Sequence, residues 1–171
     1  MKMETMSRNV VDIMKQLSKS DGLGRLLVNN VSEPLKNPIP QGYKLINPTS
    51  SDAKILPYPF DVEATTIDGS FIRVYYNDGE FNENEVIAES QLHIDIICAK
   101  NLWLINDGDK SLIRPYEIMG RVIDMLGKRS LNSTIKVHFT GYQHLYINQK
   151  FDAIRLYCEY MSVETWYYER F

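Results

Sequence analysis

The sequence predicts an α+β fold, with a mostly antiparallel sheet packed by helices on one face and a long Pro-rich arm. Three observations lead to this prediction. Apolar residues near the N-terminus recur with the period of a helix, six of the seven prolines fall within 31–60, and segments after residue 70 alternate apolar and polar side chains as strands do. We therefore expect N-terminal helices over 1–30, the Pro-rich arm over 31–60, an α+β core domain over 61–165 and an aromatic C-terminal tail over 166–171.

The first helix is predicted from four apolar residues that would share one face: Val10, Ile13, Met14 and Leu17. Thr5 or Ser7 is expected to cap its N-terminus. The polar run Ser20-Asp21-Gly22 interrupts the pattern. A short second helix, capped by Asp21 and ending near Asn29-Asn30, is expected to follow.

The arm, residues 31–60, is predicted to lack regular structure because each proline removes a backbone donor and favours an extended conformation in the preceding residue. It nevertheless contains many apolar side chains, among them Tyr43, Tyr58 and Phe60, which is unusual for a free linker. The arm is therefore expected to pack on its own subunit or on a neighbouring one.

The first long strand is predicted over Phe71–Tyr76, ending at the turn signal Asn77-Asp78-Gly79. An acidic loop over 80–90 is expected next. Within the following strand, apolar residues from Leu92 to Cys98 alternate with polar ones, and the strand is expected to continue towards Ile105 before a turn at Asn106–Asp109.

A helix is predicted after Pro115, ending at Gly127. Two more strands are expected, one around Ile135–Phe139, ended or bent by Gly141, and one over about Ala153–Val163. The helix is expected to pack on the sheet. Its predicted inner face consists of Ile118, Met119, Val122 and Leu126. The strand residues predicted to meet it are Ile94, Ile96, Val137, Phe139, Ile154 and Leu156.

Composition excludes several classes of protein. The chain has 171 residues, 19 Lys plus Arg and 22 Asp plus Glu, hence a formal charge of −3, which offers no general attraction to nucleic acid or anionic membranes. No apolar run of membrane-spanning length occurs, and the N-terminus lacks the apolar core of a signal peptide. Two cysteines 60 residues apart cannot make a disulfide framework or a zinc ribbon.

The sequence shows no catalytic, cofactor-binding or metal-binding motif, so we expect a protein that is not an enzyme and needs no cofactor. His93, His138 and His144 lack metal-ligand spacing, and His93 and His138 are expected on exposed strand faces. Cys98 and Cys158 fall on apolar strand faces and are expected to be buried. The acidic residues of 80–90 could form a carboxylate pair, but a solvated loop is the commoner meaning of such a run.

The remaining signals indicate binding between proteins. The chain contains 11 Tyr, 6 Phe and 2 Trp, and aromatic side chains are enriched at protein interfaces. The predicted interface residues come from the arm, the acidic loop and the C-terminal tail: Tyr43, Tyr58, Phe60, Glu83, Glu85, Trp166, Tyr167, Tyr168 and Phe171. The alternative for the tail is that it folds back onto its own core.

Several sequence features occur in an order that resembles a known family. The proline-rich segment ends in Ile55–Phe60, the strand His93–Cys98 precedes Asn101–Leu104, Arg114–Met119 opens a helix, and Phe139–Tyr142 precedes the last strand. Over about residues 55–163, this order resembles the small tail-completion or tail-terminator proteins of tailed bacteriophages. It is similar, more loosely, to their head-to-tail connector proteins.

The resemblance implies a structural virion protein that assembles as a homo-oligomeric ring, six-fold in the family. Such a ring caps the tail tube, binds the tail tube protein and the connector or neck proteins, and lets genomic DNA pass through its lumen without specific binding. It implies no membrane partner, and a location in the tail or neck of the virion, with the host cytoplasm during assembly. The alternatives are a head-completion or stopper ring or another neck connector, and, from a different class, a cytoplasmic enzyme or small-molecule-binding protein.

Overall fold

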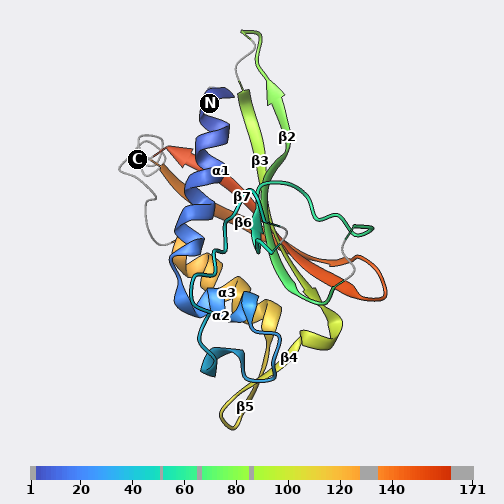
Figure 1. Ribbon diagram of the computed structural model, residues 1–171. Coiled ribbons are helices and arrows are strands. Elements are labelled where there is room, and N and C mark those ends of the chain that lie inside the picture. Colours follow the sequence, from blue (N-terminus) through green and yellow to red (C-terminus); the bar gives the residue numbers. More distant parts are fainter. Residues whose placement is uncertain (1–2, 51, 65–66, 85–86, 128–134, 163–171) are drawn as a thin grey trace, which may run out of the picture.

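A sheet with strand order β1-β2-β3-β7-β6 forms the centre of the protein, and helices pack on one of its faces (Figure 1). The computed structural model describes residues 3–50, 52–64, 67–84, 87–127 and 135–162. The helices are α1 (Met3–Ser18), α2 (Asp21–Val28), α3 (Arg114–Gly127) and the short 3-10 turns η1 (Pro34–Lys36) and η2 (Lys100–Leu102). The strands are β1 (Ile55–Leu56), β2 (Ser70–Phe81), β3 (Ile87–Ala99), β4 (Leu104–Asp107), β5 (Lys110–Ile113), β6 (Ile135–Tyr146) and β7 (Phe151–Ser162).

The predicted fold class is confirmed. β2, β3, β7 and β6 are antiparallel neighbours, the short β1 runs parallel to β2, and β4 and β5 form a separate hairpin. Apolar side chains of α1, α2 and α3 meet one face of the large sheet in a single buried cluster. This two-layer arrangement follows from the 3.6-residue period of the helices and the two-residue period of the strands.

The inner face of α3 is the predicted one. Ile118, Val122 and Leu126 are fully buried, and Met119 is partly buried against the same cluster. The predicted strand residues that belong to this cluster are Ile94, Ile96, Val137, Phe139 and Leu156, and Ile154 is buried as well. Burial of these side chains supplies the main favourable free energy of folding, because apolar area is removed from water on both layers.

The predicted caps of the first two helices are wrong. The first helix already includes Met3, so Thr5 and Ser7 lie inside it. Ser20, rather than Asp21, caps α2, because its hydroxyl oxygen accepts a hydrogen bond from the Leu23 amide at 3.2 Å. Asp21 lies in the first turn and pairs instead with Arg25 at 2.7 Å.

The predicted turn at Asn77-Asp78-Gly79 is also wrong. β2 continues through these residues to Phe81, and the register shifts between Tyr76 and Asp78. A β-bulge of this kind accommodates the residues that would otherwise reverse the chain. The predicted acidic loop is therefore largely a β2–β3 hairpin, in which Glu80 lies opposite Glu89 and which extends beyond the helices (Figure 1).

Two further strand boundaries differ from the prediction. β3 ends at Ala99, and η2 separates it from β4, so it does not continue to Ile105. Gly141 does not end β6. The strand shifts register between Phe139 and Gly141 and continues to Tyr146. The turn between β4 and β5 is confirmed, and Gly108 adopts the positive φ of 66° that favours glycine there.

The proline-rich segment packs on its own chain. Leu45, Ala53 and Ile55 are buried, and the Leu45 carbonyl accepts hydrogen bonds from the amides of Lys54 and Ile55. Ile55 pairs with Ile72, so the end of the arm becomes the edge strand β1. Contact of the arm with a neighbouring subunit stays a prediction.

Arg114, the first residue of α3, is fully buried and binds backbone oxygens instead of a carboxylate. Its guanidinium donates to the carbonyls of Leu102 at 2.8 Å, Val31 at 3.0 Å and Asn29 at 3.1 Å, and also to that of Leu26. Burial lowers the pKa of Arg114. The last turn of α2 leaves carbonyls without helical partners, and a cation is favourable at that end of a helix. One side chain therefore joins α2, the start of the arm and η2.

Replacing Val122 by Asp should abolish soluble expression, because the substitution buries an unpaired charge between α3 and the sheet. Gly120→Asp is the matched control, since Gly120 is exposed on the same helix and a Cβ there meets nothing within 4 Å. Soluble yield and thermal melting measure the difference. A Val122→Asp variant that melts like the wild type would show that α3 is packed differently.

Replacing Arg114 by Met should lower the free energy of unfolding by about 3 kcal/mol or more, because several buried carbonyls lose their donor at once. Arg114→Lys should recover only part of the loss, since an ammonium has three donors. The control Lys36→Met removes an exposed ion pair with Glu33 and should change the free energy of unfolding far less. Chemical denaturation measures all three; equal losses for Arg114→Met and Lys36→Met would contradict the assigned role.

Candidate protein-interaction surface

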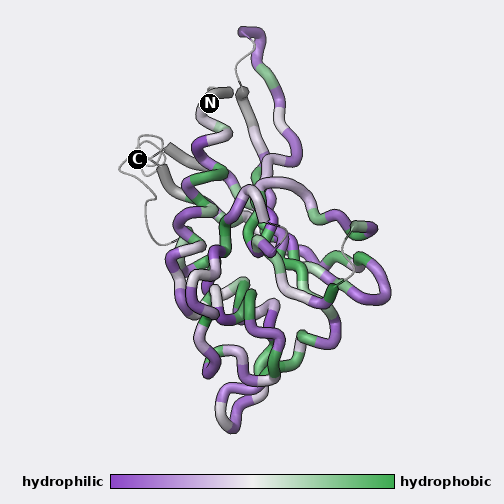
Figure 2. The backbone as a smooth tube through the Cα atoms, viewed as in Figure 1, coloured by the Kyte–Doolittle hydropathy of each residue, from purple (hydrophilic) through white to green (hydrophobic). Residues whose placement is uncertain are grey.

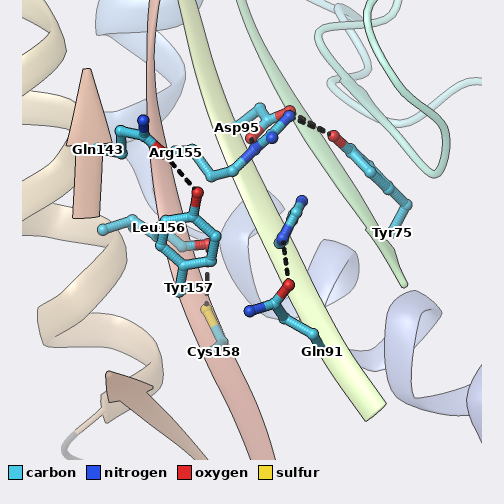
Figure 3. Close-up of polar contacts among 9 residues, drawn as sticks. Tyr75, Gln91, Asp95, Gln143, Arg155, Leu156, Tyr157 and Cys158 are labelled. Atoms are coloured by element: carbon cyan, nitrogen blue, oxygen red, sulfur yellow. Dashed lines mark hydrogen bonds and ion pairs between the residues drawn. The ribbon is translucent and has the colours of Figure 1, made fainter. Parts of the chain in front are cut away.

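The sheet face opposite the helices carries a polar network at its centre (Figure 3). Arg155 donates from Nε to Asp95 Oδ1 at 2.8 Å and from Nη2 to Oδ2 at 3.0 Å. The Tyr75 hydroxyl donates to the same Oδ2 at 2.6 Å and accepts from Arg155 at 2.9 Å. Burial, followed by the hydrogen bond to Asp95, raises the pKa of Tyr75. Both carboxylate oxygens of Asp95 accept hydrogen bonds, so neither is available to act as a base. The network also links side chains of β2, β3 and β7.

His93 lies beside this network and is buried, not exposed as predicted. It is 2% exposed because the rings of Tyr75 and Tyr157 flank it edge-on, with centroids at 5.7 Å and 5.1 Å. Its Nε2 lies 3.1 Å from Gln91 Oε1. Burial lowers the pKa of His93, so the neutral ring is favoured at this position. His138 is exposed, as predicted.

The described residues contain no group of three or more His, Cys, Asp or Glu side chains arranged to hold a metal ion. None of the described helices is long and apolar enough to cross a membrane. Cys98 and Cys158 are both fully buried, as predicted. Burial raises the pKa of Cys98 to about 11 and also raises that of Cys158. Such thiols have little nucleophilic character at neutral pH.

The structure separates the predicted interface residues of the arm. Tyr43 is half-buried, and its hydroxyl donates to the carbonyl of Asp52. Phe60 is partly buried against Phe71 and Phe151, with ring centroids at 5.5 Å and 5.2 Å. Tyr58 is 51% exposed. Tyr58 and Phe60 therefore lie near one another, whereas Tyr43 packs against a different part of the core.

The predicted acidic and C-terminal interface residues fall mostly outside the described part of the chain. Glu83 is exposed in the loop of the β2–β3 hairpin. Glu85 and the tail residues Trp166, Tyr167, Tyr168 and Phe171 lie outside the described residues. Their role at an interface stays a prediction.

Five aromatic side chains form a surface that the sequence pattern did not indicate. This aromatic surface consists of Trp103, Tyr116, Tyr142, His144 and Tyr146. His144 stacks on Trp103 at 5.4 Å and on Tyr146 at 4.7 Å, while Tyr116 packs edge-on against Trp103 at 6.3 Å. The register places Tyr142, His144 and Tyr146 on one face of β6. The end of η2, the start of α3 and β6 therefore meet at one end of the sheet.

The aromatic surface is open to solvent. Tyr142 is 67% and Tyr146 86% exposed. Two further apolar residues, Leu104 and Ile113, are exposed and pair with each other across the β4–β5 hairpin. Leu104 directly follows Trp103 in the sequence, and Ile113 directly precedes Arg114. Within the described residues, no strand pairs with the outer edge of β6. Exposed aromatic side chains beside an open sheet edge are typical of a surface that binds another protein.

The signal that could have indicated this surface is the alternation Tyr142-Gln143-His144-Leu145-Tyr146, which has the two-residue period of a strand. Because Gly141 is expected to end or bend the preceding strand, no strand is predicted beyond it. Trp103 and Tyr116 are far from β6 in sequence, and only the packing of η2 and α3 brings them there.

These features define an α+β protein with an exposed aromatic surface at one end of its sheet. The family model YomW matches residues 20–160, and the chain belongs to the YomW family. That family is phage-derived, and membership is consistent with a phage protein. No curated protein and no solved structure matches the chain.

The reactivity of the two buried thiols tests whether the core between the sheet and the helices is closed to solvent. In the native protein at pH 8, a chromogenic disulfide reagent should label neither Cys98 nor Cys158, and both should react after unfolding in guanidinium. A pKa of about 11 for Cys98 leaves only about one thiolate in a thousand at pH 8, and that fraction rises with pH. Rapid labelling of either thiol in the native protein would contradict the described core.

Proposed function

We propose that this protein is a structural component of a tailed-phage particle, a tail-terminator or tail-completion protein that forms a ring. The ring would cap the tail tube, join it to the connector or neck proteins and allow DNA through its lumen without specific binding. It would reside in the virion after assembly in the host cytoplasm and would carry out no catalysis. Membership of a phage-derived family and the order of sequence features support the proposal.

The aromatic surface carries the proposal. Large aromatic side chains that remain in water in a single chain release a large apolar area when another protein covers them. The rings of Trp103, His144 and Tyr146 already stack on one another in the single chain. Their side chains would therefore lose little conformational entropy on binding. The surface would contact an adjacent subunit or a tail or neck protein.

A head-completion or stopper ring remains the nearest alternative. It would use the same fold and surface and would differ in the partner that the ring meets. From a different class, an enzyme or a small-molecule-binding protein is the other alternative, and the described residues contain no group of three or more His, Cys, Asp or Glu side chains that would hold a catalytic metal ion.

The double variant Tyr142→Ser, Tyr146→Ser tests the proposal. Truncation of an aromatic anchor at an interface costs about 2 kcal/mol or more, so self-association or binding to purified tail tubes should weaken about thirty-fold or more. Thermal melting should change little because both side chains are exposed. Sedimentation and negative-stain microscopy, alone and with tail tubes, measure the effect.

His138→Ser, an exposed position on the same strand, is the matched control and should assemble like the wild type. Unchanged assembly and tube binding in the double variant would remove the aromatic surface from the interface. A wild-type protein that forms no ring and binds neither tail tubes nor neck proteins would overturn the proposed function itself.

A further inference from the structure

We propose that Arg73 and the rings around it form a carboxylate-binding site that receives the acidic tip of the β2–β3 hairpin from a second copy of this chain. The inference rests on the proposed assembly into a ring and names one contact within it. The Arg73 site is defined as Lys54, Tyr58, Phe60, Phe71 and Arg73. The acidic tip is defined as residues 77–84.

Arg73 is a buried cation with no carboxylate partner among the described residues. It lies in β2 between Leu56 of β1 and Asp95 of β3, on the sheet face opposite the helices. Asp95 is the nearest carboxylate across the strand, but both its oxygens bind Arg155 and Tyr75. Within the described residues, no ion pair joins Arg73 to an acidic side chain.

The guanidinium of Arg73 is also short of hydrogen bonds. Arg73 is only 6% exposed, and its Nε and Nη1 have no partner in the described part of the chain. Instead, three aromatic rings surround it, with centroids 5.1 Å (Tyr58), 5.7 Å (Phe60) and 5.8 Å (Phe71) from the guanidinium carbon. Ring faces attract a cation but do not replace the hydrogen bonds that a buried guanidinium loses. An added carboxylate would supply them.

Lys54 adds a second positive charge at the same place. Its Nζ lies 4.6 Å from the centroid of Phe71, the ring that also contacts Arg73. Burial lowers the pKa of Lys54, and Arg73 lowers it further, while Asp52 opposes the shift. Two cations that share one ring favour an incoming anion because it relieves their repulsion.

Among the described residues, Tyr58 and Phe60 of the arm lie over the guanidinium of Arg73. Tyr58, which is 51% exposed, lies over the guanidinium between the exposed Pro57 and Pro59. An exposed ring can change rotamer without disturbing the core. Tyr58 also shares a side-chain hydrogen bond with Arg73. Rotation of Tyr58 would therefore exchange that bond for one to the incoming carboxylate and open a path from solvent to Arg73.

The acidic tip has the matching chemistry. Residues 77–84 include Asp78, Glu80 and Glu83, all exposed, and no basic residue. Phe81 in the same segment is 64% exposed and offers a ring to Tyr58 and Phe60. Figure 2 shows that the projecting part of β2 is mainly hydrophilic with one hydrophobic stretch. Acidic groups beside a phenyl ring suit a guanidinium within a cluster of aromatic rings.

The tip cannot reach Arg73 of its own chain. Glu80 lies seven positions after Arg73 in β2, which is about 23 Å along a strand, and the hairpin extends away from the helices (Figure 1). The occupant is therefore a second copy. A contact between two different surfaces of identical chains is heterologous, and such contacts close into a ring when the rotation permits.

The first experiment reverses charges on the exposed tip, where folding is not at risk. The double variant Glu80→Lys, Glu83→Lys should weaken self-association at least tenfold by sedimentation, with unchanged thermal melting. Arg73→Gln should weaken it similarly. The matched control Asp107→Lys, Asp109→Lys changes two exposed acidic residues at the β4–β5 turn and should associate like the wild type.

Mixing two variants tests whether the acidic tip of one chain contacts the Arg73 site of another. Arg73→Glu and the tip double variant should each associate poorly alone, and an equimolar mixture should associate better because each contact then joins opposite charges. Should Arg73→Glu fail to fold, cross-linking gives the same information. Tyr58→Cys with Phe81→Cys in one chain should form a ladder of disulfide-linked oligomers under mild oxidation, whereas Tyr58→Cys with Asp109→Cys should not.

The outcomes separate this inference from the proposed function. Wild-type rings that form normally with the reversed tip, and no cross-linked ladder, overturn the carboxylate site and leave the ring intact. Loss of association in Arg73→Gln but not in the tip variant would mean that the site holds a different anion, which also overturns it. A wild-type protein that stays monomeric at every concentration would overturn both.

Discussion

Arg114 holds together the parts of the molecule that no strand pairing connects. Its side chain binds carbonyls from the end of α2, the start of the arm and η2, and its own amide donates to the Trp103 carbonyl at 2.7 Å. The indole of Trp103 in turn donates to the Cys98 carbonyl at 3.2 Å. Because Trp103 and Tyr116 both lie within a few residues of these contacts, the aromatic surface depends on the same buried cation.

The two faces of the sheet are stabilised by different interactions. The helix-covered face is apolar, and its stability comes from area removed from water. The opposite face combines a small apolar cluster around Phe151 with the fully bonded group Tyr75, Asp95 and Arg155. Such a network fixes strand register more than it adds stability, since charges lose much of their hydration on burial. Arg73, two residues from Tyr75, lies outside the network, and this makes the face chemically asymmetric.

Elements with a strong period could be predicted from the sequence. Val122 and Leu126 on a helix, and Ile94 and Ile96 on a strand, identify the core by their spacing alone. The bulges could not be predicted, because Asn77-Asp78-Gly79 is as suitable for a turn as for an extra residue within a strand. The role of Arg114 could not be predicted either, because an arginine at a helix start usually lies at the surface. Three of its four acceptors lie more than 80 residues away in the sequence.

Only the aromatic character of the candidate surface could be predicted from the sequence. The aromatic composition indicates protein binding, but the choice of residues depends on tertiary packing. The arm sequence predicts Tyr58 as an interface residue, whereas its position over Arg73 follows from the pairing of β1 with β2. The contact of Trp103 with His144 depends on where η2 turns the chain, which no local pattern encodes.

The bulge in β6 decides which side chains this end of the sheet presents. Phe139 lies opposite Cys158 on the helix side, and the extra residue before Gly141 returns Tyr142 to that same side. With strict alternation, Gln143 and Leu145 would occupy the positions beside Trp103 instead. A deletion of one residue here would exchange an aromatic surface for a mixed amide and aliphatic one. The helix-covered core would be unchanged, but Leu145 would leave the small apolar cluster around Phe151. The chemistry of this surface can thus be changed by inserting or deleting one residue in β6, with almost no change in amino-acid composition.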